Sequence, residues 1–354
     1  MVACAVGAGA YEYYLMSLPP AKTRLIVSTT TSLYETGFLD ALKSKFEVKY
    51  PNMNVSFISQ GTGLAIQTAM RGDADMLLVH APSQEYPFLK GGYGVNRKIV
   101  AYNFFVILGP SEDLVGIRGK SPSDALKAIR YAGLNGTAMW VSRGDNSATY
   151  TKEVSLWKAA GLDVRQLRQE KWYLEAGSGM TATLKLANEK RGYTLSDTAS
   201  YLLNFNNHNI DLAKLIEAQK SMLNVYSAIA DDPRNANMTK MNFQGSMQLI
   251  KYLVSDEGQQ LLADYGTSQY GKPLFGPYLK LLQTNTDLLG NDPAQLIQWI
   301  RDYAFLDGSE CPEQFRYQAE SLYSTQAPQP VLLTSILAAV GQRKTPACIQ
   351  SSKV

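Results

Sequence analysis

The sequence contains little of the material from which metal sites are built. Its 354 residues include only two histidines, His80 and His208, and three cysteines. Zinc sites in proteins usually combine three or four histidine and cysteine ligands, so these few residues leave little to build one. We therefore expect no bound metal cation and no cofactor.

The sequence also lacks a large excess of charge of either sign. The formal net charge is +3, and no run of lysine and arginine stands out. Proteins that bind nucleic acid usually carry such a run or patch. With 45% hydrophobic and 18% charged residues, the composition is that of an ordinary globular protein. We expect a chain that does not bind nucleic acid and that is long enough for two lobes plus an appendage.

The N-terminus lacks the length of a clear membrane span. Val2–Leu18 is largely apolar, but Glu12 interrupts it and no basic segment precedes it, and a span needs about 20 residues. Two interpretations stay open. Residues 1–21 are a signal or anchor, or the true start lies upstream and Cys4 carries a lipid, with Ala5–Ala21 as the tether. Both place the rest of the chain outside the cytoplasm, anchored to the cell membrane.

What the sequence does contain is a series of short apolar runs, each followed by a small polar turn. Leu25–Val27 predicts a buried strand. Four hydroxyl residues follow: Thr29, Thr30, Thr31 and Ser32. An amphipathic helical pattern then begins, with one apolar face: Phe38, Leu39, Leu42 and Phe46. A helix start exposes unpaired N–H groups at the positive end of the helix dipole, which favours a bound anion.

A capping box is the alternative interpretation of this turn. Ser32 and Glu35 have the spacing of such a box, in which Ser32 would only cap the helix. Four hydroxyls in a row exceed what a cap needs. We therefore favour an oxyanion site that includes Thr30, Thr31 and Ser32.

Three further strand-to-helix turns repeat this pattern. The first contains Thr62 and Gly63, where glycine lets the backbone approach a ligand. The second contains Arg143, which can donate two parallel hydrogen bonds to an anion. Asp145 and Ser147 are expected to support it, although Arg143 and Asp145 alone would form a weak surface ion pair. The last turn contributes three residues: Ser178, Gly179 and Met180.

Two long extended runs frame the middle of the chain, at Lys98–Gly109 and Leu223–Ala230. They predict two α/β lobes joined by two extended linkers, with all four polar turns facing the cleft between the lobes. The first lobe would comprise residues 22–105 and 224–280, and the second would comprise residues 106–223. We expect His80 to be a structural residue at a strand end.

Several motifs, in order from about Arg24 to Tyr278, resemble the tungstate-binding proteins of ABC uptake transporters, which have the type II periplasmic-binding-protein fold. The motifs are Thr29–Ser32, Gly72–Asp75, Val79–Pro82, Gly92–Arg97, Ser142–Asp145, Glu175–Met180, Ala187–Lys190 and Tyr193–Leu195. The resemblance implies an extracytoplasmic, monomeric protein that captures tungstate between its lobes and delivers it to a membrane permease.

The chain departs from the family pattern in three places. Asn146–Thr149 stands where the family tends to have Asp-Ser-Gly-Thr, and Asp197-Thr198 stands where many members have Asp-Arg. Residues 281–354 form an extension that the family generally lacks. We expect it to be mainly helical, with helices starting at Asp292 and at Val331–Val340. It would cap the first lobe, with Cys311 and Cys348 either paired or free.

Two points about the function stay open: which ligand is bound, and whether the protein is a transport receptor, a sensor or an enzyme. Molybdate, phosphate and sulfate receptors share the fold, as do oxyanion sensors and some enzymes. No histidine, cysteine or pair of acids falls within the four turns, so we expect binding and no catalysis. Because the turns offer mainly donors, a fully deprotonated oxyanion is favoured over phosphate. Tungstate and molybdate are not distinguished by this reasoning.

Overall fold

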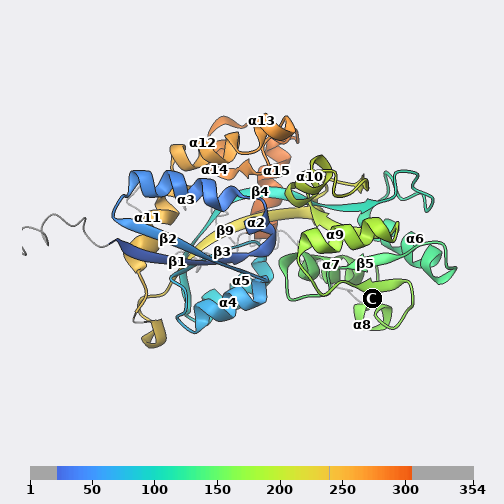
Figure 1. Cartoon of the computed structure of the whole chain (residues 1–354), viewed down its shortest axis with the longest axis horizontal. Coiled ribbons are helices and arrows are strands. Elements are labelled where there is room, and N and C mark those ends of the chain that lie inside the picture. The colour runs from blue at the N-terminus through green and yellow to red at the C-terminus, as the bar shows by residue number, and fades with distance from the viewer. Residues whose placement is uncertain (1–21, 239, 305–354) are drawn as a thin grey trace, which may run out of the picture.

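The computed structural model describes residues 22–238 and 240–304, and Figure 1 shows two α/β lobes connected by long strands. The strands are β1 (Thr23–Thr30), β2 (Met53–Gln60), β3 (Met76–Val79), β4 (Gly94–Gly109), β5 (Trp140–Ser142), β6 (Tyr173–Glu175), β7 (Tyr193–Asp197), β8 (Ala213–Ile216), β9 (Leu223–Asp231) and β10 (Gly276–Pro277). The helices are α2 (Thr31–Glu35), α3 (Phe38–Lys49), α4 (Thr62–Met70), α5 (Pro82–Lys90), α6 (Pro122–Leu134), α7 (Ala148–Ala159), α8 (Val164–Leu167), α9 (Met180–Glu189), α10 (Thr198–Asn206), α11 (Phe243–Leu253), α12 (Asp256–Asp264), α13 (Thr267–Tyr270), α14 (Tyr278–Thr284) and α15 (Pro293–Ala304).

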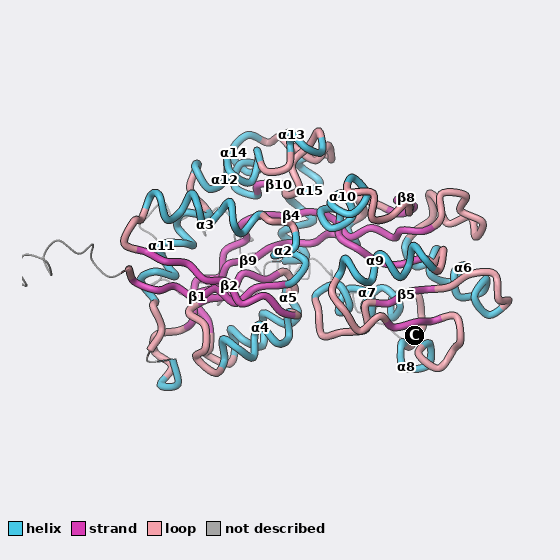
Figure 2. Tube along the Cα trace, viewed as in Figure 1, coloured by secondary structure: helices cyan, strands magenta, loops and turns pink. Residues whose placement is uncertain are grey.

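Strands β4 and β9 join the lobes. The sheet order is β2-β1-β3-β9-β4-β7-β5-β6, with β8 and β10 also paired to β4. Strand β4 pairs with β9 up to Phe104, opposite Leu223, and with β7 from Phe105, opposite Asp197. Figure 2 shows these two strands in the middle of the molecule, with β4 continuing into the second lobe. The prediction of a bilobal α/β fold with two extended connections is confirmed.

Each lobe has its own apolar core. Helix α3 buries the face that the sequence predicted, and all four residues named for that face pack in the core of the first lobe. The second core contains three tryptophans, Trp140, Trp157 and Trp172. Burial of such faces from water is the main force that holds each lobe together. The strand ends and helix starts that carry the polar turns are therefore fixed by the packing behind them.

The start of the C-terminal extension does not cap the first lobe alone, which corrects our expectation. Leu296 and Ile300 of α15 are fully buried in the core that contains Phe105 and Val225 of the linker strands. Their helix also reaches the second lobe, where Asp302 pairs with Lys220 at 2.5 Å. Figure 1 places α15 beside the middle of the molecule, behind β4. The helix starting near Asp292 is confirmed.

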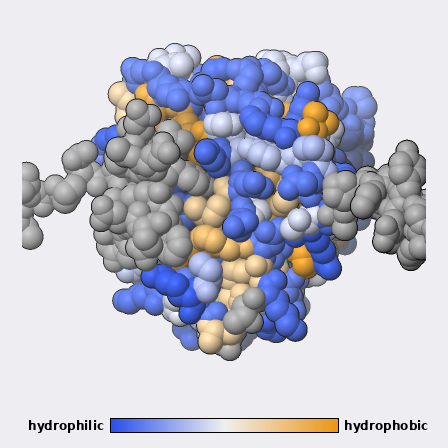
Figure 3. Space-filling model, turned by 90° about the vertical axis from the view of Figure 1, so that its left-hand side faces the viewer, coloured by the Kyte–Doolittle hydropathy of each residue, from blue (hydrophilic) through white to orange (hydrophobic). Residues whose placement is uncertain are grey.

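Other predictions fall on residues that the structure does not describe. These are the anchor or lipid tether at 1–21, Cys4, Cys311, Cys348 and the helix at Val331–Val340. No helix in residues 22–238 and 240–304 is long and apolar enough to cross a membrane. The end of the molecule shown in Figure 3 is largely hydrophilic, with a smaller apolar area near its centre.

Candidate anion site between the lobes

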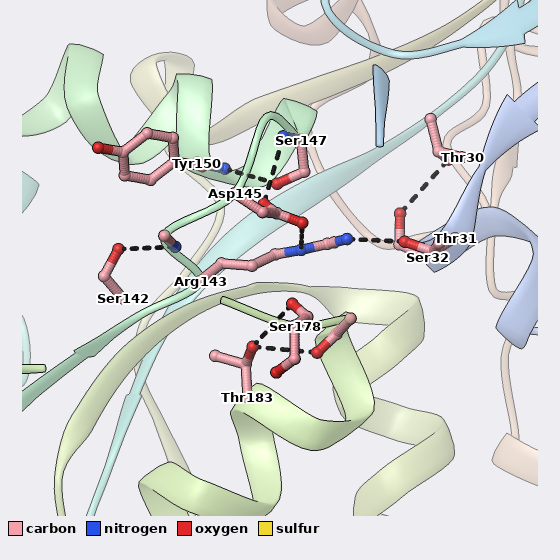
Figure 4. Close-up of polar contacts among 12 residues, drawn as sticks. Thr30, Thr31, Ser32, Ser142, Arg143, Asp145, Ser147, Tyr150, Ser178 and Thr183 are labelled. Atoms are coloured by element: carbon pink, nitrogen blue, oxygen red, sulfur yellow. Dashed lines mark hydrogen bonds and ion pairs between the residues drawn. The ribbon is translucent and has the colours of Figure 1, made fainter. Parts of the chain in front are cut away.

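Arg143 directly follows β5 and bridges the two lobes. Its side chain is only 2% exposed, and its Nε donates to Asp145 Oδ2 at 2.9 Å. Its Nη2 donates to Thr31 Oγ1 of the first lobe at 2.7 Å, as Figure 4 shows. The interpretation as a weak surface pair is therefore wrong. A guanidinium has five N–H donors, more than these two acceptors satisfy, so it retains donors for an anion.

Asp145 and Ser147 shape the turn around Arg143. Asp145 Oδ1 accepts a hydrogen bond from the N–H of Ser147 at 3.2 Å. Ser147 caps α7, and its Oγ accepts from the N–H of Tyr150 at 3.1 Å. These contacts fix the position of the arginine relative to the start of α7. The N-terminus of α7 therefore lies beside a buried cation, and both features attract an anion.

The hydroxyl residues in the turn of the first lobe have different roles. Thr29 donates to the carbonyl oxygen of Leu78 at 2.8 Å and so serves the sheet. Thr30 caps α2 by accepting from the N–H of Leu33 at 3.4 Å. The capping box centred on Ser32 is therefore wrong. Ser32 lies instead with its Oγ 3.3 Å from Nε2 of His80, so His80 contacts a predicted site residue and is more than a strand end.

Two threonine hydroxyls are buried without a hydrogen-bond partner among the described residues. Thr62 is the first residue of α4, and Thr149 is the second residue of α7. The starts of these helices touch, because the N–H of Gly63 donates to the carbonyl oxygen of Asn146 at 3.0 Å. Leaving a buried hydroxyl without a hydrogen bond costs about 1–3 kcal/mol of folding free energy, and nearly all such groups in proteins are paired. A hydroxyl left unpaired therefore points to a ligand as its partner. The sequence analysis selected Thr62 but missed Thr149. The feature that pointed to Thr149 was its place in the first turn of the helix that follows Arg143.

The other predicted site residues, Gly63 and those of the turn before α9, lie in or beside contacts within the protein. The amide of Gly63 is used between the lobes, and Met180 is buried in a core cluster. At the start of α9, after Gly179, the N–H and Oγ1 of Thr181 donate to Glu35 Oε2 at 3.3 and 2.8 Å. The carbonyl oxygen of Ser178 accepts from Thr183 (Figure 4). A carboxylate of the first lobe thus occupies the turn where a bound anion was predicted.

Comparison with known proteins identifies the family of this chain. Residues 17–257 match the family described as PBP superfamily domain. The chain is 34% identical over 258 residues to the tungstate-binding protein TupA of Peptoclostridium acidaminophilum. The matched region covers 73% of this chain and 86% of the relative. The chain belongs to the TupA family of the PBP superfamily.

A further relative and a solved structure extend the likeness. The chain is 42% identical over 257 residues to a putative ABC transporter anion-binding protein of Haloferax volcanii, covering 72% of this chain and 71% of the relative. Its fold matches the crystal structure of the tungstate ABC transporter from Geobacter sulfurreducens with a TM-score of 0.60 and 39% identity. That match covers 69% of this chain and 100% of the other. The family match ends at residue 257, before α14 and α15.

A cavity of about 370 Å³ lies next to the site in this TupA-family fold. It is lined by residues of both lobes and of α15, among them His80, Phe105, Lys152 and Tyr303. The predicted ligand residues do not line it. Lys152 is buried there, and burial lowers its pKa to about 8. Its Nζ donates to the carbonyl oxygen of Ser221 at 3.1 Å and lies 4.3 Å from the centre of the Tyr303 ring, so the lysine has partners of its own.

Proposed function

We propose that this chain is the extracytoplasmic solute-binding protein of an ABC transporter and that it captures tungstate between its two lobes. The observation that carries the proposal is the buried guanidinium of Arg143, which reaches across the lobes to Thr31. The names of its TupA relatives support tungstate as the ligand. Molybdate, which has the same tetrahedral shape and charge, is the second candidate.

The proposed site consists of donors suited to a tetrahedral dianion. Arg143 supplies the positive charge, and charge-assisted hydrogen bonds are the strong ones in proteins. The buried hydroxyls of Thr62 and Thr149, which have no partner within residues 22–238 and 240–304, are ready to donate. The starts of α4 and α7 add N–H groups at the positive ends of two helices. Thr31 and Ser32 complete the proposed set from the first lobe.

Closure of the lobes would couple binding to transport. A ligand that contacts both lobes stabilises the closed form by its differential affinity for that form. Contacts between the lobes, such as Arg143 with Thr31 and Thr181 with Glu35, already define a closed arrangement. We propose that the closed form, as a monomer, docks on a membrane permease. Anchoring through residues 1–21 or a lipid on Cys4 would keep it near that permease.

Isothermal titration with tungstate, molybdate, sulfate and phosphate tests this proposal. We expect tungstate to bind with nanomolar affinity and sulfate and phosphate to bind far more weakly. Arg143→Ala should weaken tungstate binding at least 100-fold, since each lost hydrogen bond to a charged group is worth about 1.5–3 kcal/mol. Arg165→Ala is the matched control, because Arg165 pairs with Asp163 at the same spacing but its side chain is 87% exposed.

Each outcome has a clear meaning. Equal affinity for tungstate and molybdate would widen the assignment to both oxyanions. Binding that survives in Arg143→Ala would overturn the proposed site. A purified protein that binds none of the four anions would overturn the proposed function and leave only the fold.

A further inference from the structure

Ser32 is connected to Asp197 by a chain of buried polar side chains that the anion site does not itself require. Ser32 Oγ lies 3.3 Å from His80 Nε2, and His80 Nδ1 lies 2.9 Å from Asn224 Oδ1. Asn224 Nδ2 donates to Asn103 Oδ1 at 2.7 Å, and Asn103 Nδ2 donates to Asp197 Oδ1 at 3.4 Å. All five side chains are buried. The chain crosses from the first lobe through both linker strands to the end of β7.

The carboxylate at the end fixes the direction of every hydrogen bond in this chain. Asp197 caps α10, and both of its carboxyl oxygens accept hydrogen bonds from the first turn of that helix. Asn103 therefore turns its NH₂ group toward Asp197 and its oxygen toward Asn224. Asn224 in turn faces His80 with its oxygen, which can only accept. Nδ1 of His80 consequently carries a proton.

Burial keeps the imidazole of His80 neutral in this arrangement. Desolvation is the largest influence and lowers the pKa of His80, and the guanidinium of Arg143 acts in the same direction. The ring also stacks on Tyr226 with centroids 4.7 Å apart. The other charged groups that face it come from four elements: Glu85 of α5, which pairs with Arg97 of β4, Asp197 of β7, and Lys152 of α7 across the shared cavity. Tyr303 of α15 also lines that cavity.

A neutral ring with its proton on Nδ1 leaves a lone pair on Nε2. The hydroxyl of Ser32 must then donate its single proton to His80. In this state Ser32 cannot donate to an anion, and its oxygen can only accept, as it does from Thr30 Oγ1 at 3.5 Å. If the hydroxyl of Ser32 turned to donate to the anion, it would leave Nε2 of His80 buried without a hydrogen bond, which costs free energy. A proton on Nε2 removes the conflict, because the imidazolium donates to Ser32 while Ser32 donates to the anion.

We infer that His80 decides whether Ser32 accepts or donates, and that capture of a fully deprotonated oxyanion draws one proton from solvent onto His80. This inference rests on the proposed function. The negative charge of the bound anion favours the imidazolium, and the imidazolium favours the anion, so the two binding events are linked. With neutral His80 the site offers an acceptor at Ser32, which suits a protonated anion such as hydrogen phosphate. His80 therefore contributes to selectivity as a positioning residue.

Nitrogen-15 NMR of the histidine rings tests the state of His80 directly. The chain has only two histidines, and His208 is exposed, so His208→Gln assigns the two sets of signals and His208 serves as an internal control. We expect the ligand-free protein to show a neutral His80 with the proton on Nδ1. Saturation with tungstate at neutral pH should produce the imidazolium at His80 and leave His208 unchanged. A proton on Nε2 in the free protein, or no change at His80 on binding, would overturn the inference.

Titration of tungstate in buffers of different ionisation enthalpy then counts the protons taken up. We expect net uptake of up to one proton per anion between pH 6.5 and 8.5, with affinity falling by up to tenfold per pH unit as the pH rises, because one proton is linked to binding. Tungstate stays fully deprotonated in this range, so the proton enters the protein. His80→Gln should abolish the uptake and flatten the pH dependence, whereas His208→Gln should leave both unchanged.

The outcomes separate the inference from the function beneath it. Failure of the wild-type protein to bind tungstate would reject both the proposed function and the inference. Tight binding without proton uptake, or uptake that persists in His80→Gln, would reject the inference and leave the function standing. If His80→Gln does not fold, the NMR signals of the wild-type protein decide.

Discussion

The N–H of Gly63 in the first lobe donates a 3.0 Å hydrogen bond to the carbonyl oxygen of Asn146 in the second lobe. A Cβ on Gly63 would lie 1.9 Å from Nδ2 of Asn146, well inside any non-bonded contact. The lobes therefore meet closely at this point. A side chain at position 63 fits the closed arrangement only if the exposed side chain of Asn146 turns away.

Gly63→Ala should oppose closure. Turning the Asn146 side chain away costs about 0.5–1.5 kcal/mol in the closed form, and the open form has no such cost. We expect tungstate affinity to fall about 2- to 10-fold, as measured by titration calorimetry. Stability of the ligand-free lobes against urea should change little, because alanine suits the first turn of α4 better than glycine does.

The double variant Gly63→Ala/Asn146→Ala is the control for this prediction. The atoms in conflict belong to the Asn146 side chain, so shortening that side chain should restore most of the affinity lost in Gly63→Ala. Wild-type affinity in the single variant would show that the lobes do not close onto this contact. An equal loss in the double variant would locate the effect elsewhere.

The sequence predicted those parts of the site that depend on local pattern. Strand-to-helix turns with small polar residues indicated the two lobes and placed Arg143, Thr31 and Thr62 between them. The structure was needed where the outcome depends on distant partners. Glu35 and Thr181 are 146 positions apart in sequence, so the sequence did not show that the start of α9 holds a carboxylate. Likewise, nothing local shows that the hydroxyl of Thr149 lacks a partner.

The extension shows the same limit. The apolar stripe of α15, with Leu296 and Ile300, predicts a helix with one buried face. Such a stripe does not specify which surface it covers. The structure places it against the linker strands and the second core instead of the first lobe alone. The contact between Ser32 and His80 likewise joins residues 48 positions apart, which is why His80 was expected to be structural only.

Thr62→Val and Thr149→Val should change stability and binding in opposite directions. Each replaces a buried hydroxyl that has no partner in the described part of the chain by a methyl group of the same shape. The ligand-free protein should become more stable by up to about 1 kcal/mol, since an unsatisfied polar group is removed. Tungstate affinity should fall about 5- to 10-fold for each variant, because a neutral hydrogen bond contributes about 1 kcal/mol. Urea unfolding and calorimetry measure the two effects.

Thr29→Val and Thr194→Val provide the opposite case. Their hydroxyls are also buried, but they donate to the carbonyl oxygens of Leu78 and Val141 at 2.8 and 2.7 Å. Both variants should lose about 1 kcal/mol of stability. If Thr62→Val and Thr149→Val were destabilised as much as these controls, their hydroxyls would have partners in the ligand-free protein. The argument that they await an anion would then fail.

Asp231→Asn should stabilise the protein increasingly as the pH rises. Asp231 is fully buried without a hydrogen-bond partner among the described residues, and burial, with Asp75 nearby, raises its pKa from 3.8 to about 9. The folded state therefore holds a proton that the unfolded state releases above about pH 4. This contribution to stability is fully present below pH 4 and is lost progressively up to about pH 9, by at most about 1.4 kcal/mol per pH unit.

Urea unfolding at pH 5.0, 7.0 and 8.5 measures this difference. The gain of Asp231→Asn over the wild type should be smallest at pH 5.0 and largest at pH 8.5, because asparagine has no proton to lose. Asp264→Asn, at an exposed position of α12, should follow the wild-type pH profile. A constant difference between Asp231→Asn and the wild type at all three pH values would mean that Asp231 does not hold a proton in the folded state.

Leu296→Ala in α15 should destabilise the lobes themselves and not only the extension. Leu296 is fully buried in the same core as the linker strands, and removing such a side chain costs about 2–5 kcal/mol. We expect one cooperative unfolding transition, shifted to lower urea by this amount, when fluorescence follows the three tryptophans of the second core together with Trp299 of α15. Gln298→Ala, on the exposed side of the same helix, should have an effect below about 0.5 kcal/mol. A separate early transition in Leu296→Ala, with the main transition unchanged, would show that the extension folds independently of the linker strands β4 and β9.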